Sequence, residues 1–181
     1  MGTSLTITYA SGQYFCLPLS NGAAEALLCA LTVAGSRELA ELQAELAEEG
    51  VSWAELAWET SLLTFFASHD RKILHNSEGF DLGRLGWQAA DFAAQKQTLL
   101  HYIELALMYS ARDIGELFNT QRLMPNLGAL RAMLWNMGPE DIPADPAFAW
   151  PLPPPAEIAL CPAHRVFLHS AGCLICHLSG G

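Results

Sequence analysis

The chain has 181 residues, of which 51% are hydrophobic and 15% are charged. That balance excludes an intrinsically disordered protein and predicts a folded chain with a well-filled interior. The formal net charge is −10, and residues 1–59 hold eight acidic side chains against one basic one. Such a field repels phosphate backbones, so we expect no nucleic-acid partner. The acidic region either attracts a basic protein partner or serves only as a solvated, solubilising face.

The sequence also indicates where the protein works. No apolar run reaches the roughly 18 residues that cross a bilayer, so we expect no membrane association. Residues 1–15 lack the basic start and the unbroken apolar core of a secretory signal. We therefore expect a cytoplasmic protein with reduced thiols. In that compartment, clustered cysteines bind a metal more often than they form a disulfide.

A β-hairpin is predicted at the N-terminus. Leu5, Ile7 and Tyr9 alternate with two threonines, a turn follows at residues 10–13, and residues 14–19 supply the second strand. The β-branched and aromatic side chains of these two segments favour strands.

Apolar periodicity and helix-end signals predict that most of the remaining chain is helical. The predicted helices span residues 23–34, 37–49, 52–67, 89–111, 113–119 and 125–137. The first is apolar nearly all round, which indicates a helix buried in the interior. We expect Gly35 to end it, Ser36 to cap the second helix and Pro125 to take the first position of the last.

The predicted domain organisation depends on proline. Residues 139–160 are rich in proline, which excludes a helix interior or a central strand and predicts an extended tether. The tether separates a hairpin plus helical domain, residues 1–138, from a Cys/His tail, residues 161–181.

The tail carries the strongest chemical signal. It holds three of the five cysteines and three of the six histidines of the chain. Cys161-x2-His164 and Cys173-x2-Cys176 are two short chelating turns separated by eight residues. Together they supply the four ligands of a tetrahedral Cys3His zinc site. Such a site replaces the hydrophobic core that a segment of about 20 residues cannot build.

Over residues 161–176 the pattern resembles the Cys/His knuckles of zinc-ribbon and short zinc-finger segments, and it indicates no family for the whole chain. The expected cofactor is Zn²⁺. His169 and His177 are alternatives to His164 as the fourth ligand. Because four protein ligands leave no position for water, we expect a structural rather than a catalytic zinc. The expected fold is mainly α-helical, with the N-terminal hairpin and a small zinc-clipped β-turn unit that extends the hairpin through residues 166–168.

Two other chemistries use part of the same motif. A c-type haem would be attached through Cys173 and Cys176, with His177 as an axial ligand. The methionines available for the opposite axial position are Met124, Met133 and Met137. Haem attachment requires export to an oxidising compartment and leaves Cys161 and His164 unexplained. A thioredoxin-like redox pair is a weaker alternative, because that motif belongs to a βαβ unit.

Other polar and aromatic residues are given structural roles. His101 and Glu104 lie three apart on a predicted helix, but without a matching pair elsewhere we expect a partly exposed histidine. His69, Asp70 and His75 are assigned to a solvated loop. Cys16 and Cys29 are expected to be buried, inert thiols. The tryptophans expected in the core are Trp53, Trp58, Trp87 and Trp135.

No catalytic set is recognisable, so we expect a protein that is not an enzyme. The function expected from the acidic helix and the structural metal is non-catalytic protein binding, as an adaptor or an immunity-type inhibitor. The alternative is a c-type haem or redox protein that uses Cys173, Cys176 and His177. An enzymatic site would have to combine the metal with His69, Asp70 or His101.

Overall fold

The structure is a computed structural model that describes residues 2–46, 56–68, 80–114, 120–145, 159–169 and 172–179. Its strands are β1 (Gly2–Thr8), β2 (Tyr14–Ser20), β3 (Phe80–Asp81), β4 (Leu168–His169) and β5 (Gly172–Cys173). Its helices are α1 (Asn21–Leu46), α2 (Ala57–Ser68), α3 (Phe92–Asp113), α4 (Leu123–Trp135) and α5 (Leu174–Ser179). The chain is mainly helical, with an N-terminal hairpin and a small C-terminal Cys/His segment, which confirms the predicted fold class.

The predicted N-terminal hairpin is confirmed. β1 and β2 pair antiparallel along all seven residues of each strand. Leu5 and Ile7 are buried in the core, as their alternation with threonine predicts. Tyr9 follows β1 and is also buried, and its hydroxyl donates a hydrogen bond of 2.8 Å to the carbonyl of Met133 in α4. This bond ties the hairpin to the helical body.

The strand that extends the hairpin is a different one from that expected. β3 pairs in parallel with β1, giving a three-stranded sheet of order β2-β1-β3. The expectation that residues 166–168 take this place is wrong, because β4 pairs with β5 in a separate two-stranded sheet. Phe80 of β3 is buried against Phe65 and Phe66 of α2, which fixes the strand at the sheet edge. A strand of two residues is too short to show alternation in the sequence.

α1 is one continuous helix, so the predicted break at Gly35 is wrong. A Cβ at Gly35 would lie 2.5 Å from a methyl carbon of Leu63 in α2 and 3.0 Å from the ring of Tyr102 in α3. The glycine therefore lets two neighbouring helices pack closely against α1. This contact offsets the roughly 1 kcal/mol that glycine costs inside a helix. Ser36 lies fully buried inside α1 and does not cap a second helix.

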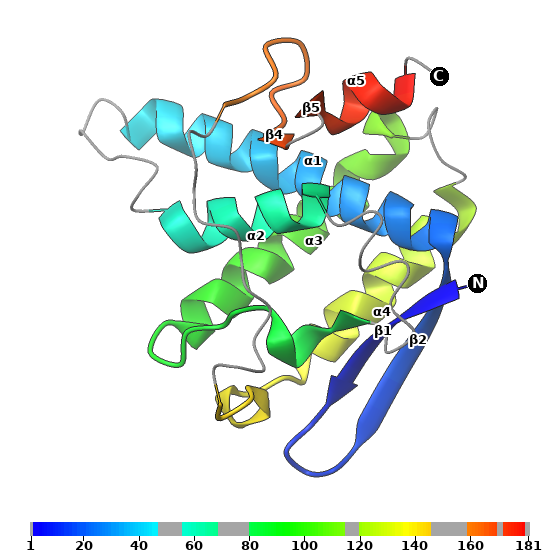
Figure 1. Cartoon of the computed structure of the whole chain (residues 1–181), viewed down its shortest axis with the longest axis vertical. Helices are drawn as coiled ribbons and strands as arrows, with labels where there is room; N and C mark the ends of the chain where they lie inside the picture. Colours follow the sequence, from blue (N-terminus) through cyan, green and yellow to red (C-terminus); the bar gives the residue numbers. More distant parts are fainter. Residues whose placement is uncertain are drawn as a thin grey trace.

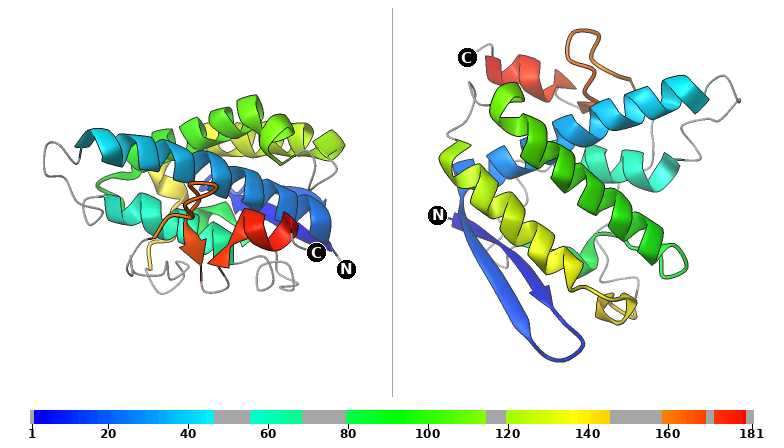
Figure 2. Two further views of the ribbon diagram at one scale, coloured as in Figure 1. Left: turned by 90° about the horizontal axis from the view of Figure 1, so that it is seen from above. Right: turned by 180° about the vertical axis from the view of Figure 1, so that it is seen from behind.

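α1 is the central element of the molecule. It contacts α2, α3 and α4. Figure 2 shows α3 and α4 on one side of α1, and α2 with the C-terminal segment on the other. Leu27, Leu31 and Val33 are almost completely buried, which confirms the prediction that the start of this helix belongs in the interior. The C-terminal segment lies along the top of the molecule and the hairpin reaches to its bottom (Figure 1).

The helices α3 and α4 occur where the sequence predicts helices, but their first and last residues differ from the predicted ones. α3 covers most of the helix predicted at residues 89–111. α4 begins at Leu123, so Pro125 takes its third position and not its first. The position is still tolerated, because the first four N–H groups of a helix have no partner within the helix.

Several predicted features lie outside the described residues. These are the end of the predicted helix 37–49, the start of the helix at 52–67, residues 115–119, and 146–158 of the predicted tether. His69, Asp70, His75 and Trp53 are among them. The predicted domain boundaries therefore stay predictions. In the part of the chain that is described, no helix combines the length and the apolar character needed to cross a bilayer.

Candidate metal centre

The first chelating turn is formed by a tight reversal of the chain at residues 159–168. Leu160 and Phe167 form an isolated antiparallel bridge that closes it. Inside, the N–H of Cys161 donates to the carbonyl of Val166 at 2.9 Å, and the N–H of Arg165 donates to the carbonyl of Cys161 at 2.8 Å. Arg165 adopts the left-handed conformation, with φ 54°. We call residues 159–168 the knuckle; it holds Cys161 and His164 on one turn.

The second chelating pair lies where a strand passes directly into a helix. β4 and β5 pair with Leu168 opposite Cys173, and Gly172 has φ 102°, a conformation that favours glycine. α5 begins immediately after Cys173. Residues three apart lie on the same face of a helical turn, so Cys173 and Cys176 face one point in space. The sequence predicts the turn at Gly172, and α5 is an element that it did not predict.

The two turns bring the four predicted ligands together. The ligand atoms of Cys161, His164, Cys173 and Cys176 all lie within 4.8 Å of one another. The imidazole Nδ1 of His164 is 3.6, 3.7 and 3.3 Å from the sulfurs of Cys161, Cys173 and Cys176 respectively. The sulfurs of Cys161 and Cys176 are 3.8 Å apart.

These separations fit a tetrahedral ion. Bond lengths of about 2.3 Å to sulfur and about 2.0–2.1 Å to nitrogen place two sulfurs about 3.8 Å apart and a sulfur and a nitrogen about 3.6 Å apart. The cysteines are free thiols, because a disulfide would bring two sulfurs to about 2.05 Å. The arrangement is therefore a group of four that could hold one metal ion.

The thiols of the group influence one another electrostatically. The pKa of Cys161 is lowered to about 6, chiefly because the backbone N–H of His164 donates to its sulfur. The pKa of Cys176 is raised to about 11, chiefly by its contact with the Cys161 sulfur and also by the neighbouring Cys173. Three sulfurs this close resist carrying three negative charges, and a divalent cation relieves that repulsion.

The knuckle is anchored on the second half of α1. Val166 and Phe167 are almost completely buried and belong to the main hydrophobic core. The backbone N–H of Phe167 donates to the hydroxyl of Ser36 at 3.3 Å, and the guanidinium of Arg165 donates to the carbonyl of Ala40 at 3.4 Å. The predicted cap residue Ser36 is thus the side chain to which the knuckle is bonded. No sequence signal singled out this role.

Three of the four potential ligands are at least partly shielded from solvent. Cys161 and Cys173 are buried, His164 is partly buried and Cys176 is exposed. Within the described residues, the group of potential metal ligands contains no carboxylate. The side chains of His169 and His177 lie outside the described part of the structure, so their rank as alternative ligands is untested.

The other singled-out residues are distributed as follows. His101 is half-exposed and contacts Glu38 of α1 at 3.0 Å, which confirms a partly exposed histidine. Glu104 pairs instead with Arg131 of α4 at 3.1 Å. Cys29 is buried, and its pKa is raised to about 12, mainly by burial. It is therefore an inert thiol, as predicted.

Two predictions of burial are wrong. Cys16 is exposed, because it lies on β2 on the face away from the core. Trp135, the last residue of α4, is 62% exposed. Trp58 and Trp87 are buried as predicted, with ring centroids 5.4 Å apart.

The chain was compared with models of known protein families, with curated proteins and with solved structures, and none of the three comparisons gives a match. The chemistry of its own residues, above all the Cys3His group, is therefore the basis for assigning a function.

Proposed function

We propose that Cys161, His164, Cys173 and Cys176 bind one Zn²⁺ ion that fixes the C-terminal segment on the helical body. The observation that carries the proposal is the set of four distances given above, three from His164 Nδ1 to sulfur and one between Cys161 and Cys176, which match the edges of a zinc tetrahedron. Thiolate and imidazole ligands in this geometry favour zinc, whereas magnesium and calcium prefer oxygen ligands.

The same geometry favours a structural role for the ion. When bound, zinc would supply four bonds that join the knuckle to the start of α5. Three thiols and one imidazole fill a tetrahedral shell, which leaves no position for a reactive water. A zinc ion also explains why Cys161 and His164 lie beside Cys173 and Cys176, a contact that the haem alternative does not require.

Metal analysis tests this part of the proposal. We expect the purified protein to hold one equivalent of zinc and, after exchange with Co²⁺, to show the absorption of tetrahedral cobalt thiolate. Cys173→Ser should lose the metal, whereas Cys16→Ser, an exposed cysteine outside the group, should retain it. A protein without bound metal, or one with a Soret band of covalent haem, would contradict the proposal.

We further propose that the protein is not an enzyme and acts in the cytoplasm as an adaptor or an immunity-type inhibitor of a basic protein. Glu41 and Glu45 support this part, because both are exposed on α1 and residues four apart share one helix face. With a net charge of −10, such a face accelerates encounter with a positively charged partner.

Capture of a partner from the native host at two salt concentrations tests the second part. We expect capture at low salt that weakens steeply as salt increases. The double variant Glu41→Lys and Glu45→Lys should abolish it. Glu140→Lys, a charge reversal at an exposed site near the hairpin turn, should leave it unchanged. Capture that is insensitive to both salt and the double variant would overturn the electrostatic partner.

A further inference from the structure

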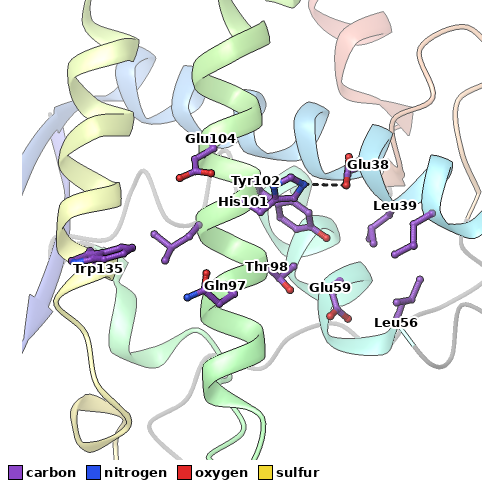
Figure 3. A pocket seen from close by; sticks show the side chains of 12 residues that line it. Glu38, Leu39, Leu56, Glu59, Gln97, Thr98, His101, Tyr102, Glu104 and Trp135 are labelled. Atoms are coloured by element: carbon purple, nitrogen blue, oxygen red, sulfur yellow. Dashed lines mark hydrogen bonds and ion pairs between the residues drawn. The ribbon is translucent and has the colours of Figure 1, made fainter.

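A second candidate site lies away from the Cys/His group, between α1, α2 and α3. It is a pocket of about 460 Å³, within the size range of small-molecule sites. Leucines from α1, from α3 and from the position just before α2 form its apolar wall, three glutamates surround it, and Trp135 lies at its edge (Figure 3). None of these residues belongs to the proposed metal site.

The hydroxyl of Tyr102 is an unpartnered polar group at this pocket. Tyr102 is 99% buried, being only 1% exposed, and its hydroxyl oxygen has no hydrogen-bond partner among the described residues. Figure 3 shows the hydroxyl pointing into the space between Glu59, Leu39 and Leu56. By contrast, the buried Tyr9 donates to a backbone carbonyl. Leaving a buried hydroxyl unbonded costs about 1–3 kcal/mol, so a hydrogen-bond partner at the Tyr102 hydroxyl would be stabilising.

The charges around the pocket are predominantly negative. Glu38 contacts His101, and Glu104 is paired with Arg131. Within the described residues, Glu59 has neither an ion-pair nor a hydrogen-bond partner, so its carboxylate is available to a ligand. Burial raises the pKa of Tyr102, and Glu59 and Glu38 raise it further. The phenol is therefore neutral and can accept a hydrogen bond through its oxygen.

The arrangement excludes two other classes of ligand. An anion would be repelled by the glutamates and would find no unpaired cation among the lining residues. A metal ion needs several ligand atoms close together. Among the described residues, the group of three or more potential ligands that lie this close is the Cys3His cluster, which is not part of the pocket. An organic cation can donate hydrogen bonds to both Glu59 and Tyr102, and its charge complements the glutamates around the pocket.

We propose that this pocket binds a small primary amine with an apolar body. The ammonium group donates to the carboxylate of Glu59 and to the hydroxyl oxygen of Tyr102, and the apolar body lies along Leu39, Leu42 and Leu56. Leu39 is buried and the other two leucines are partly buried, so they offer a dry surface beside the charged group. The pocket volume of about 460 Å³ is that of a small-molecule site, which favours a free small molecule as the ligand.

Titration of the full chain with three probes of equal length tests this site. The probes are n-hexylamine, 1-hexanol and hexanoate, followed by the amide resonances of α1, α2 and α3. We expect n-hexylamine to bind at least about tenfold more tightly than 1-hexanol, and hexanoate not to bind, because only the amine carries a positive charge and hexanoate carries a negative one. Equal binding of amine and alcohol would show an apolar pocket only and overturn the proposal, as would no binding of the amine.

Two variants and a control locate the ammonium group. Glu59→Gln and Tyr102→Phe should each weaken n-hexylamine by about tenfold, while Glu140→Gln should not change it. Tyr102→Phe should keep or raise the melting temperature, because it removes an unbonded buried hydroxyl. All variants should keep their metal content, so failure here is distinguishable from failure of the zinc site. Tighter binding of Nα-acetyl-lysine N-methylamide than of n-hexylamine would overturn the assignment to a free ligand.

Discussion

The N-terminal hairpin and the C-terminal segment are held in their folded conformations by different interactions. Both flank the helical body, and they lie toward opposite ends of the molecule (Figure 1). The hairpin is held by a ladder of seven residue pairs. The C-terminal sheet has only two pairs, and the helix after it has six residues. A ladder and a helix this short are not stable alone. The C-terminal segment has too few backbone pairs to be stable, so metal ligation by its side chains would have to supply the missing stability.

The two regions also differ in how they are attached to the helices. Asp141 accepts hydrogen bonds from the N–H of Ala10 at the hairpin turn, at 2.6 Å, and from the N–H of Gly138, at 2.7 Å. The knuckle is attached through buried Phe167 and its bond to Ser36. The hairpin therefore needs no ion, whereas the C-terminal segment combines an apolar anchor with the proposed zinc.

Removal of the metal should give the largest effect, and it should affect one region only. Structural zinc contributes roughly 10 kcal/mol or more to the folding of small zinc-binding peptides, far more than the short C-terminal sheet can replace. With a chelator, we expect residues 159–169 and 172–179 to lose hydrogen-exchange protection while β1 and β2 keep theirs. Loss of protection in both regions at once would show that the two attachments are not independent.

Phe167→Ala tests the apolar half of the C-terminal attachment. The side chain is 1% exposed in the core, so its removal should lower the free energy of unfolding by about 3–5 kcal/mol. Denaturant unfolding of the zinc-loaded protein measures this. Leu168→Ala, at a 38% exposed neighbour, is the matched control and should cost much less. If the two variants cost the same, the knuckle does not depend on the core.

The affinity for zinc should decrease as the pH is lowered. In the metal-free protein the pKa of Cys176 is about 11, so its thiol is protonated at neutral pH and must release a proton to bind zinc. Each released proton weakens binding by about tenfold, or about 1.4 kcal/mol, per unit decrease in pH. Below pH 6 the dependence should become steeper, because Cys161, with a pKa of about 6, then also takes up a proton. Competition with a chelator at several pH values measures the slope. A flat profile between pH 6 and 8 would contradict thiolate ligation.

Asp141→Ala should give the smallest effect, confined to the hairpin turn and the adjoining residues 138–141. It removes two acceptors for backbone N–H groups in a partly exposed setting, so we expect a loss of roughly 1 kcal/mol. Thermal unfolding measures it, and Glu140→Ala is the neighbouring control. A change in zinc content in Asp141→Ala would go against the separation of the two regions.

The parts of the structure that depend on residue spacing within short segments could be predicted from the sequence. The hairpin follows from alternation at Leu5, Ile7 and Tyr9. The proximity of Cys161, His164, Cys173 and Cys176 was expected from their spacing, because two chelating turns share one ion only if they meet. Elements of this kind can be predicted because their conformation depends mainly on residues close by in the sequence.

Other parts depend on contacts that no local pattern contains. Gly35 is a reasonable helix stop by itself, yet α1 continues through it, and the glycine leaves room for the side chains of Leu63 and Tyr102. Trp135 is apolar, yet it lies exposed at a helix end. Tyr102 drew no attention in the sequence, because an unbonded hydroxyl becomes visible only when its surroundings are known.

One stretch of α1 serves both candidate sites. Ser36 and Ala40 hold the knuckle, and between and beyond them Glu38, Leu39 and Leu42 line the amine pocket. If both ligands bind as proposed, they act on the same two turns of α1 from different sides of the helix. Any effect of the metal on the affinity for the amine would then be equal to the effect of the amine on the affinity for the metal.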